Sequence, residues 1–230
     1  MAMAAPIRTN MSPPHMTTEQ DVLTLAQWFS PAFPVGAFAY SHGLETAIQR
    51  GVIACAGDLE NWLSDVVAHG SGRNDCIVLR AAYACTSAVE LTDINHIALA
   101  ASASRERVME TQLQGAAFGT TTAAIRGTAL PELCYPVAVG AAAAQARFNV
   151  DLVAAFYLHA FAGNLVSAAV RAVPLGQTDG QRVHAALIPL CDRIAKATRA
   201  NTPDDLHSTA FASDIAAMQH ETLQPRIFRS

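Results

Sequence analysis

The abundance of alanine is the feature that most constrains the fold of this sequence: 46 of its 230 residues are alanine. Alanine is the strongest helix former, whereas valine, isoleucine and threonine, which favour strands, dominate no long alternating run. Hydrophobic residues make up 51% of the chain, which is enough for a sizeable core within one large domain. The sequence therefore predicts an all-α, single-domain bundle of about nine or ten helices.

Apolar residues recur at helical spacing along most of the chain. Asp58 is expected to cap an amphipathic helix whose apolar residues fall at i, i+3, i+4, i+7 and i+8. These residues are Leu59, Trp62, Leu63, Val66 and Val67. A more apolar helix is expected at 152–172, but Asn164, Ser167 and Arg171 interrupt it, so no clean stretch of about 20 apolar residues exists. We expect a buried core helix and no membrane span.

The two ends of the chain differ from its middle. Residues 1–18 carry three prolines and lack the continuous apolar run of a signal peptide, so we expect a disordered arm on a cytoplasmic protein. Residues 19–219 form the predicted helical domain, and residues 220–230 form a flexible tail. The net charge of −4, without clustered basic residues, argues against nucleic-acid binding. The five cysteines form no CxxC pair and are expected to be reduced thiols in the core.

Motifs for common catalytic chemistry are missing from the sequence. It contains no GxxxxGK[ST] loop, no GxGxxG, no HExxH and no GxSxG. Among the eight histidines, His42 lies three residues from Glu45 and could share a helix face with it, which alone is a weak signal for a metal site. We therefore predict no enzyme, no catalytic residues, no cofactor and no metal site, and a function that depends on binding other proteins.

Four segments have more than one interpretation. The polar stretch SRERVMETQLQG, at 104–115, is either a solvated helix face or a polar surface used by a partner. The apolar loop 30–45, the loop 171–182 and the tail place bulky apolar groups and arginines on irregular backbone or at a free end, as docking surfaces do. The alternative is that they are ordinary loops covered by their own domain and a frayed end.

The last three segments resemble the signatures of the UreF family of urease accessory proteins. SPAFPVGAFAYSHGLETAIQRGVI (30–53) is similar to the family pattern SP, x, LPVGGFSYSxGLE. RAVPLGQTDGQR (171–182) resembles its second signature, and HETLQPRIFRS (220–230) resembles its terminal HE, three residues, R-L-F-x-S. The resemblance covers about 22–230. The departures are Phe33, Ala37, Gln224-Pro225 and Ile227, where the family usually has Leu, Gly, Tyr-Ser and Leu.

The resemblance implies an all-α homodimer that takes part in urease maturation. Members of this family bind the accessory protein UreH (UreD in many bacteria), recruit the GTPase UreG and dock on apo-urease. Nickel then reaches urease as UreG hydrolyses GTP, and UreF modulates UreG as an activator or a checkpoint. Two alternatives stay open: a nickel-binding carrier that uses His42 and Glu45, and a purely structural helical scaffold.

Site residues follow from the resemblance position by position. The tail residues that match the UreH-binding end are Arg226, Ile227, Phe228 and Arg229. The residues that match the second signature, facing UreG or the dimer partner, are Arg171, Gln177, Asp179, Gln181 and Arg182. Arg171 is the nearest equivalent of an activator's arginine. The residues expected at a dimer interface or a nickel passage, or simply holding the loop in shape, are Tyr40, Ser41, His42 and Glu45.

Overall fold

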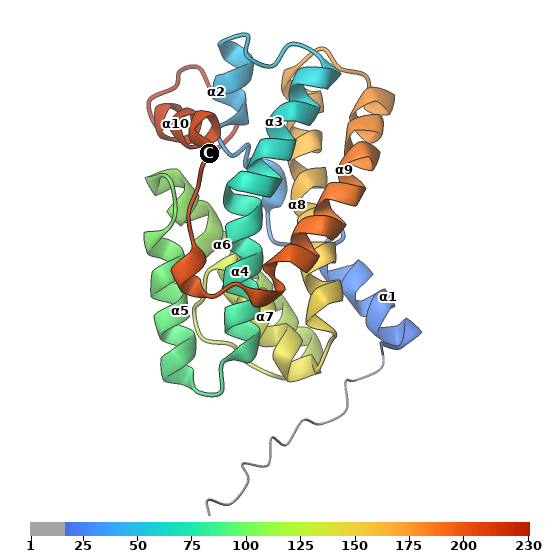
Figure 1. The fold of residues 1–230 in the computed structure, drawn as a ribbon, viewed down its shortest axis with the longest axis vertical. Coiled ribbons are helices and arrows are strands. Elements are labelled where there is room, and N and C mark those ends of the chain that lie inside the picture. The colour runs from blue at the N-terminus through green and yellow to red at the C-terminus, as the bar shows by residue number, and fades with distance from the viewer. Residues whose placement is uncertain (1–16) are drawn as a thin grey trace, which may run out of the picture.

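The computed structural model describes residues 17–230, which form helices, turns and loops without strands (Figure 1). The predicted all-α bundle is confirmed. The predicted arm falls mainly on residues 1–16, which lie outside the described residues. The α-helices are α1 (Glu19–Trp28), α2 (Leu44–Gln49), α3 (Ala56–His69), α4 (Ser71–Ala84), α5 (Ala88–Ala100), α6 (Arg105–Arg126), α7 (Tyr135–Ala146), α8 (Val150–Ala172), α9 (Gln177–Ala197) and α10 (Phe211–His220).

Helix starts follow local capping chemistry. Thr18 caps α1, because its side chain accepts a hydrogen bond from the Asp21 N–H and the Asp21 carboxylate accepts one from the Thr18 N–H. The predicted cap at Asp58 is wrong. Helix α3 begins earlier, with Cys55 as the N-cap, and Asp58 lies in its first turn, where its carboxylate accepts the backbone N–H of Cys55 at 3.1 Å.

The core consists of two apolar clusters that share helices α4 and α8. One joins α2, α3, α4, α8 and α9, and the other joins α1, α4, α6, α7 and α8. By length and composition alone α8 could cross a membrane, but half of its apolar window is buried inside the fold. It packs against α9, α4 and α7 in the middle of the bundle, as expected for a core helix (Figure 1). The five cysteines are free thiols, and three of them are buried.

Two glycines let helices approach more closely than any side chain would allow. A Cβ at Gly140 of α7 would lie 2.3 Å from the Leu79 carbonyl oxygen of α4. A Cβ at Gly115 of α6 would lie 2.0 Å from the Leu133 carbonyl oxygen, in the segment that leads into α7. These contacts hold α7 tightly between α4 and α6.

The C-terminal part of the chain folds back over the bundle. After α9 the chain crosses in front of α4, where the Arg73 side chain donates to the Asp205 carbonyl at 3.0 Å, and then rises to α10 (Figure 1). Helix α10 packs on α2 and α6. The tail 220–230, expected to be flexible, lies against its own domain, with Phe228 only 3% exposed.

Candidate functional site

The three signature segments, far apart in the sequence, meet at one place in the fold. The Ser41 N–H donates to the Ser230 carbonyl at 2.8 Å, and the Arg229 N–H donates to the Ala39 carbonyl at 2.8 Å. Arg171, at the end of α8, donates from Nη2 to the Phe38 carbonyl at 2.7 Å. The loop 30–45, the end of α8 and the tail therefore form one composite surface.

Glu45 is the residue that fastens the tail. Its Oε1 accepts the backbone N–H of Ile227 at 2.7 Å, and its Oε2 accepts that of Phe228 at 2.9 Å. Glu45 reaches this position because Gly43, at φ 76°, turns the chain into α2 beside α10. A Cβ at Gly43 would lie 2.4 Å from the Ala217 nitrogen, so only glycine allows this approach.

A buried histidine connects the same carboxylate to α6. His220, which is fully buried, places Nε2 3.1 Å from Glu45 Oε2 and Nδ1 2.6 Å from Glu106 Oε2. The other oxygen of Glu106 accepts from Arg226 Nη1 at 2.6 Å. The tail is thus held by two carboxylates, one from α2 and one from α6. We call Glu45, Glu106, His220 and Arg226 the tail clamp.

Arg171 lies against the tail as well. Its guanidinium carbon lies 4.7 Å from the centre of the Phe228 ring, over the ring face, which is a favourable cation–π geometry. Together with the bond to Phe38, this contact commits the Arg171 side chain to positioning the loop and the tail. In this conformation Arg171 does not project freely as an activator's arginine would.

Helix α6 supplies a polar seam, in the stretch for which a solvated helix face was one of two interpretations. That interpretation is wrong for one side of α6, whose residues Glu106, Arg107, Glu110, Thr111 and Gln114 are buried. They recur at i, i+1, i+4, i+5 and i+8, a helical period that could have signalled a buried polar stripe, although the partners of the stripe lie far away in the sequence. The Ser230 hydroxyl donates to Glu110 at 2.7 Å, so the seam also touches the tail.

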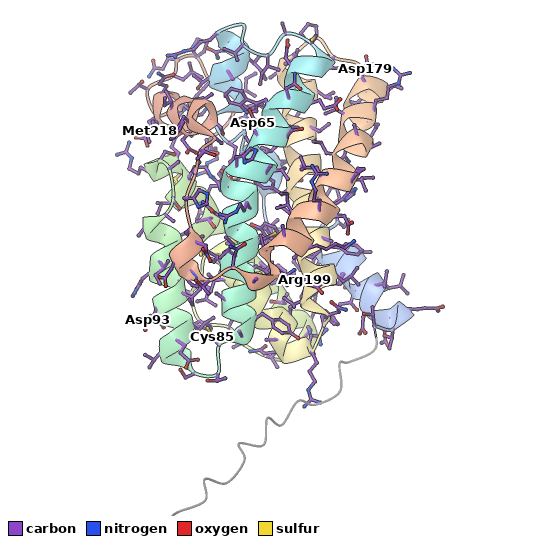
Figure 2. The ribbon with its side chains drawn as sticks, in the orientation of Figure 1. Asp65, Cys85, Asp93, Asp179, Arg199 and Met218 are labelled. Atoms are coloured by element: carbon purple, nitrogen blue, oxygen red, sulfur yellow. The ribbon has the colours of Figure 1, made fainter. Side chains whose placement is uncertain are left out.

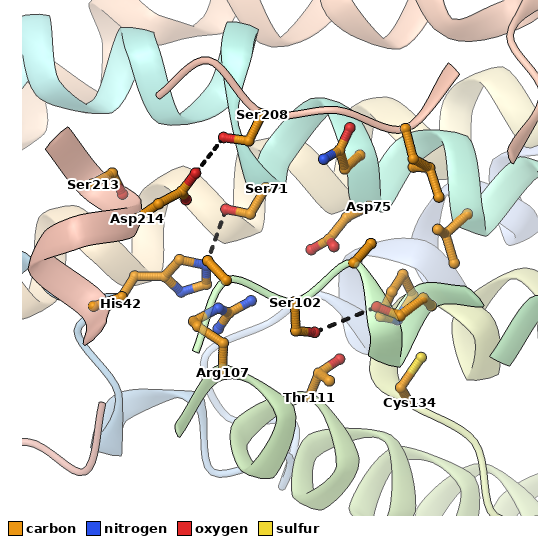
Figure 3. Close-up of a pocket in the computed structure, with 18 of the residues that line it drawn as sticks. His42, Ser71, Asp75, Ser102, Arg107, Thr111, Cys134, Ser208, Ser213 and Asp214 are labelled. Atoms are coloured by element: carbon orange, nitrogen blue, oxygen red, sulfur yellow. Dashed lines mark hydrogen bonds between the residues drawn. The ribbon is translucent and has the colours of Figure 1, made fainter. Parts of the chain in front are cut away.

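A chamber of about 160 Å³, lined by both polar and apolar side chains, adjoins the seam (Figure 3). A smaller cavity of about 40 Å³ shares four of its lining residues. The shared residues are His42, Asp75, Arg107 and Thr111. Figure 3 shows side chains from several helices and from the turn before α2 converging on this space, which is large and polar enough to hold ordered water.

Charge in the chamber is balanced by pairing. Burial acts to raise the pKa of Glu110, but the neighbouring Arg107 and His42 outweigh it and hold that pKa well below its usual range. Burial and Arg107 lower the pKa of His42, which favours the neutral ring. Burial raises the pKa of Asp75 to about 6, although Arg107 and the hydrogen bond from Tyr157 oppose it.

His42 and Glu45 do not face one another. His42 has a left-handed backbone at φ 59°, and it places Nδ1 3.4 Å from Glu110 and Nε2 3.1 Å from the Ser71 hydroxyl. Glu45 points to the tail instead. Within residues 17–230, no three His, Cys, Asp or Glu side chains are arranged to hold a metal ion. Of the first-signature residues, Tyr40 and His42 line the smaller cavity, whereas Ser41 and Glu45 bind the tail.

The remaining second-signature residues lie at the start of α9. Arg182 pairs with Asp179 at 2.7 Å, one turn apart on the surface. Asp179 lies at the same end of the bundle as Met218 of α10 (Figure 2). Gln177 is exposed, and Gln181 lines a groove of about 570 Å³ together with the loop 30–38.

Several large apolar side chains near the tail are open to solvent. Ile227 is 72% exposed and Phe38 is 71% exposed. Helix α10 begins at Phe211 and bears an apolar stripe at helical spacing. The stripe consists of Phe211, Ile215 and Met218, each at least half exposed. Exposed apolar patches of this kind are typical of interaction sites.

Comparisons with known proteins agree with the resemblance in the three signatures. The family model described as UreF matches residues 53–188. A urease accessory protein UreF from Ruegeria pomeroyi is 54% identical over 213 residues, which is 93% of this chain and 98% of the relative. One from Roseobacter denitrificans is 51% identical, covering 90% and 93%. One from Cereibacter sphaeroides is 50% identical, covering 91% and 98%.

Proposed function

The chain belongs to the UreF family of urease accessory proteins, and from that premise we propose that it is a non-catalytic maturation chaperone. It bridges UreH (UreD) and the GTPase UreG in the cytoplasm, as a homodimer, and supports GTP-dependent nickel insertion into apo-urease. The observation that carries this proposal is the convergence of the three signature segments on one surface. Nothing in the fold of an isolated domain requires the exposed apolar groups on that surface.

The tail and α10 are the parts assigned to UreH. Phe228 fills a groove of its own domain, so the groups left for a partner are Ile227, Arg229 and the stripe on α10. Apolar anchors beside an arginine match the composition of interface centres. Gln177, Asp179, Gln181 and Arg182 are assigned to UreG or to the second UreF copy because they match the second signature, and Gln181 lines a groove together with the loop 30–38.

Replacing the exposed apolar side chain of Ile227 by a charged one tests the assignment of the tail to UreH. The variant Ile227→Asp is expected to fold normally and to lose UreH co-purification and urease activation, because a buried unpaired charge weakens an interface strongly. Val89→Asp is the matched control, since Val89 is also 72% exposed but lies on α5, outside the tail. Normal UreH binding and urease activation by Ile227→Asp would instead favour the structural scaffold.

A nickel passage through the chamber is a second part of the proposal. Tyr40, His42 and Asp75 offer oxygen and nitrogen atoms in two cavities that share lining residues, and the residues described at 17–230 form no cluster that would trap an ion. Filling the chamber with Ser102→Phe should slow nickel transfer to urease while UreH binding stays intact. Equilibrium dialysis tests the nickel-carrier alternative: tight one-to-one binding that His42→Ala abolishes would favour the carrier.

A further inference from the structure

His220 of the tail clamp has a carboxylate oxygen against each of its two ring nitrogens. Nδ1 lies 2.6 Å from Glu106 and Nε2 lies 3.1 Å from Glu45. A neutral imidazole has one N–H and one lone pair, so one of its nitrogens would face a carboxylate oxygen with no proton between them. Only a ring protonated at both nitrogens donates to both carboxylates.

Charge balance in the clamp leads to the same protonation state. Glu45 and Glu106 each carry a negative charge, and Arg226 supplies one positive charge. With a neutral ring the clamp would hold a net negative charge around a fully buried side chain, which is costly in a low-dielectric interior. With an imidazolium at His220 the clamp is neutral.

We propose that His220 is an imidazolium in the folded protein, and that its proton fastens the C-terminal segment, 211–230, to α2 and α6. His220 ends α10, so releasing this segment would move the ring away from both carboxylates and into water. Both charge-assisted hydrogen bonds of the ring would be lost on release.

The two acidic side chains next to the clamp, Glu110 and Glu221, pair with arginines of α6. Glu221, just after α10, faces Arg105 at the start of α6, with the two side chains 3.6 Å apart at a partly exposed site. Glu110 faces Arg107 and reaches the tail only through the Ser230 hydroxyl. The groups in contact with the His220 ring are therefore Glu45 of α2 and Glu106 of α6.

Nuclear magnetic resonance of the full chain tests the proposal without any partner protein, so its failure is separate from failure of the proposed function. With 15N-labelled histidine, the His220 ring is expected to show two protonated nitrogens at pH 7.5, its signals being assigned by their loss in His220→Gln. Amide exchange in 211–230 is expected to be faster in His220→Gln than in the parent protein, because a neutral side chain replaces the charged donor. A ring with one protonated nitrogen in the docked protein at pH 7.5 would overturn the proposal.

Matched variants isolate the proton. In Glu106→Gln the side-chain NH₂ can donate to a neutral Nδ1, so the His220 ring of this variant is expected to show one protonated nitrogen at pH 7.5. His96→Gln, at an exposed histidine on α5, should leave the ring signals of His220 as in the parent protein. Exchange in 211–230 that is equally fast in the parent protein and in His220→Gln would contradict a role for the imidazolium in fastening the segment.

Discussion

At the scale of single residues, Glu45 makes more of the polar contacts that hold the tail than Glu106 does. Glu45 accepts two consecutive backbone N–H groups and faces a buried histidine, so three donors depend on it. Hydrogen bonds to charged acceptors are stronger than neutral ones, and a buried donor left without an acceptor is costly. The recognition of main-chain groups also explains why Ile227 can be exposed while its backbone is fixed.

Glu45→Gln is expected to destabilise the protein by about 2–4 kcal/mol, because one charged acceptor for three donors is replaced by a neutral one. Urea unfolding measures the loss, and faster amide exchange at Ile227 and Phe228 localises it. Glu60→Gln, at an exposed acid on α3, should change stability by less than about 0.5 kcal/mol. Equal effects of the two substitutions would show that Glu45 does not fasten the tail.

Asp75 carries a pH-dependent cost. Its pKa is raised to about 6 in the folded protein, mainly by burial, so the folded state binds a proton more tightly than the unfolded chain does. The stability this proton provides is present at low pH and is lost as pH rises through about 6. The free energy of unfolding of Asp75→Asn, relative to that of the parent protein, should therefore rise by about 1–2 kcal/mol between pH 4.5 and pH 8. This value is reduced because Asp75 is partly exposed to the chamber.

Urea unfolding at the two pH values measures this gain. The amide oxygen that Asp75→Asn introduces would still accept from the Tyr157 hydroxyl, which is 2.8 Å from the Asp75 carboxylate in the parent protein. If the difference in unfolding free energy between the parent protein and Asp75→Asn is the same at both pH values, burial of the charged carboxylate does not destabilise the parent protein.

At the scale of helices, periodicity predicted most elements but not what each face meets. The spacing of Leu59, Leu63, Val66 and Val67 predicted a buried stripe, and these residues are buried in α3. In α6 the same spacing predicted a polar face, and the sequence could not show whether that face is buried or open to solvent. Its partners, such as His220, lie more than a hundred residues away, so only the tertiary fold shows that this face is internal.

The packing of α7 against α4 depends on the absence of a side chain at Gly140. Gly140→Ala would place a methyl group 2.3 Å from the Leu79 carbonyl of α4, and neither backbone can move away without disturbing the core. Overpacking of this kind costs about 1–3 kcal/mol or more. Calorimetry is expected to show a lower Tm for this variant.

Gly119→Ala is the matched control for that packing. Gly119 also lies inside a helix, α6, but its nearest neighbour would be the Leu130 Cβ at 3.9 Å, an ordinary contact. Replacing a helical glycine by alanine without a clash should gain up to about 1 kcal/mol. A raised or unchanged Tm for Gly140→Ala would show that α4 and α7 can separate freely.

At the scale of the whole molecule, the surface assigned to partners is also part of the fold's own packing. Motif resemblance placed the three segments on docking surfaces, but it could not show that they pack on one another. The phenyl group of Phe228 belongs to the core that α3, α8 and α9 build, while the neighbouring Ile227 is exposed. The tail therefore joins the stability of the bundle to the presentation of its binding groups.

Arg171 decides between two roles at this scale, positioning the surface or acting on UreG directly. If it positions the surface, Arg171→Ala should lower the GTPase response of UreG and also speed amide exchange in the loop 30–45 and in the tail. Both effects follow because its contacts to Phe38 and Phe228 are lost. Arg171→Lys should restore much of both, since an ammonium can still donate to the carbonyl and contact the ring.

Arg182→Ala serves as the control for Arg171, because Arg182 is also an exposed signature arginine but pairs with Asp179 on the surface. It should leave exchange in the loop and the tail unchanged. Arg171 would be reassigned if the GTPase response of UreG were lost in both Arg171→Ala and Arg171→Lys while amide exchange in the loop and the tail stayed as in the parent protein. The guanidinium would then have to leave Phe228 in the complex and act on the nucleotide of UreG, as an activator's arginine does.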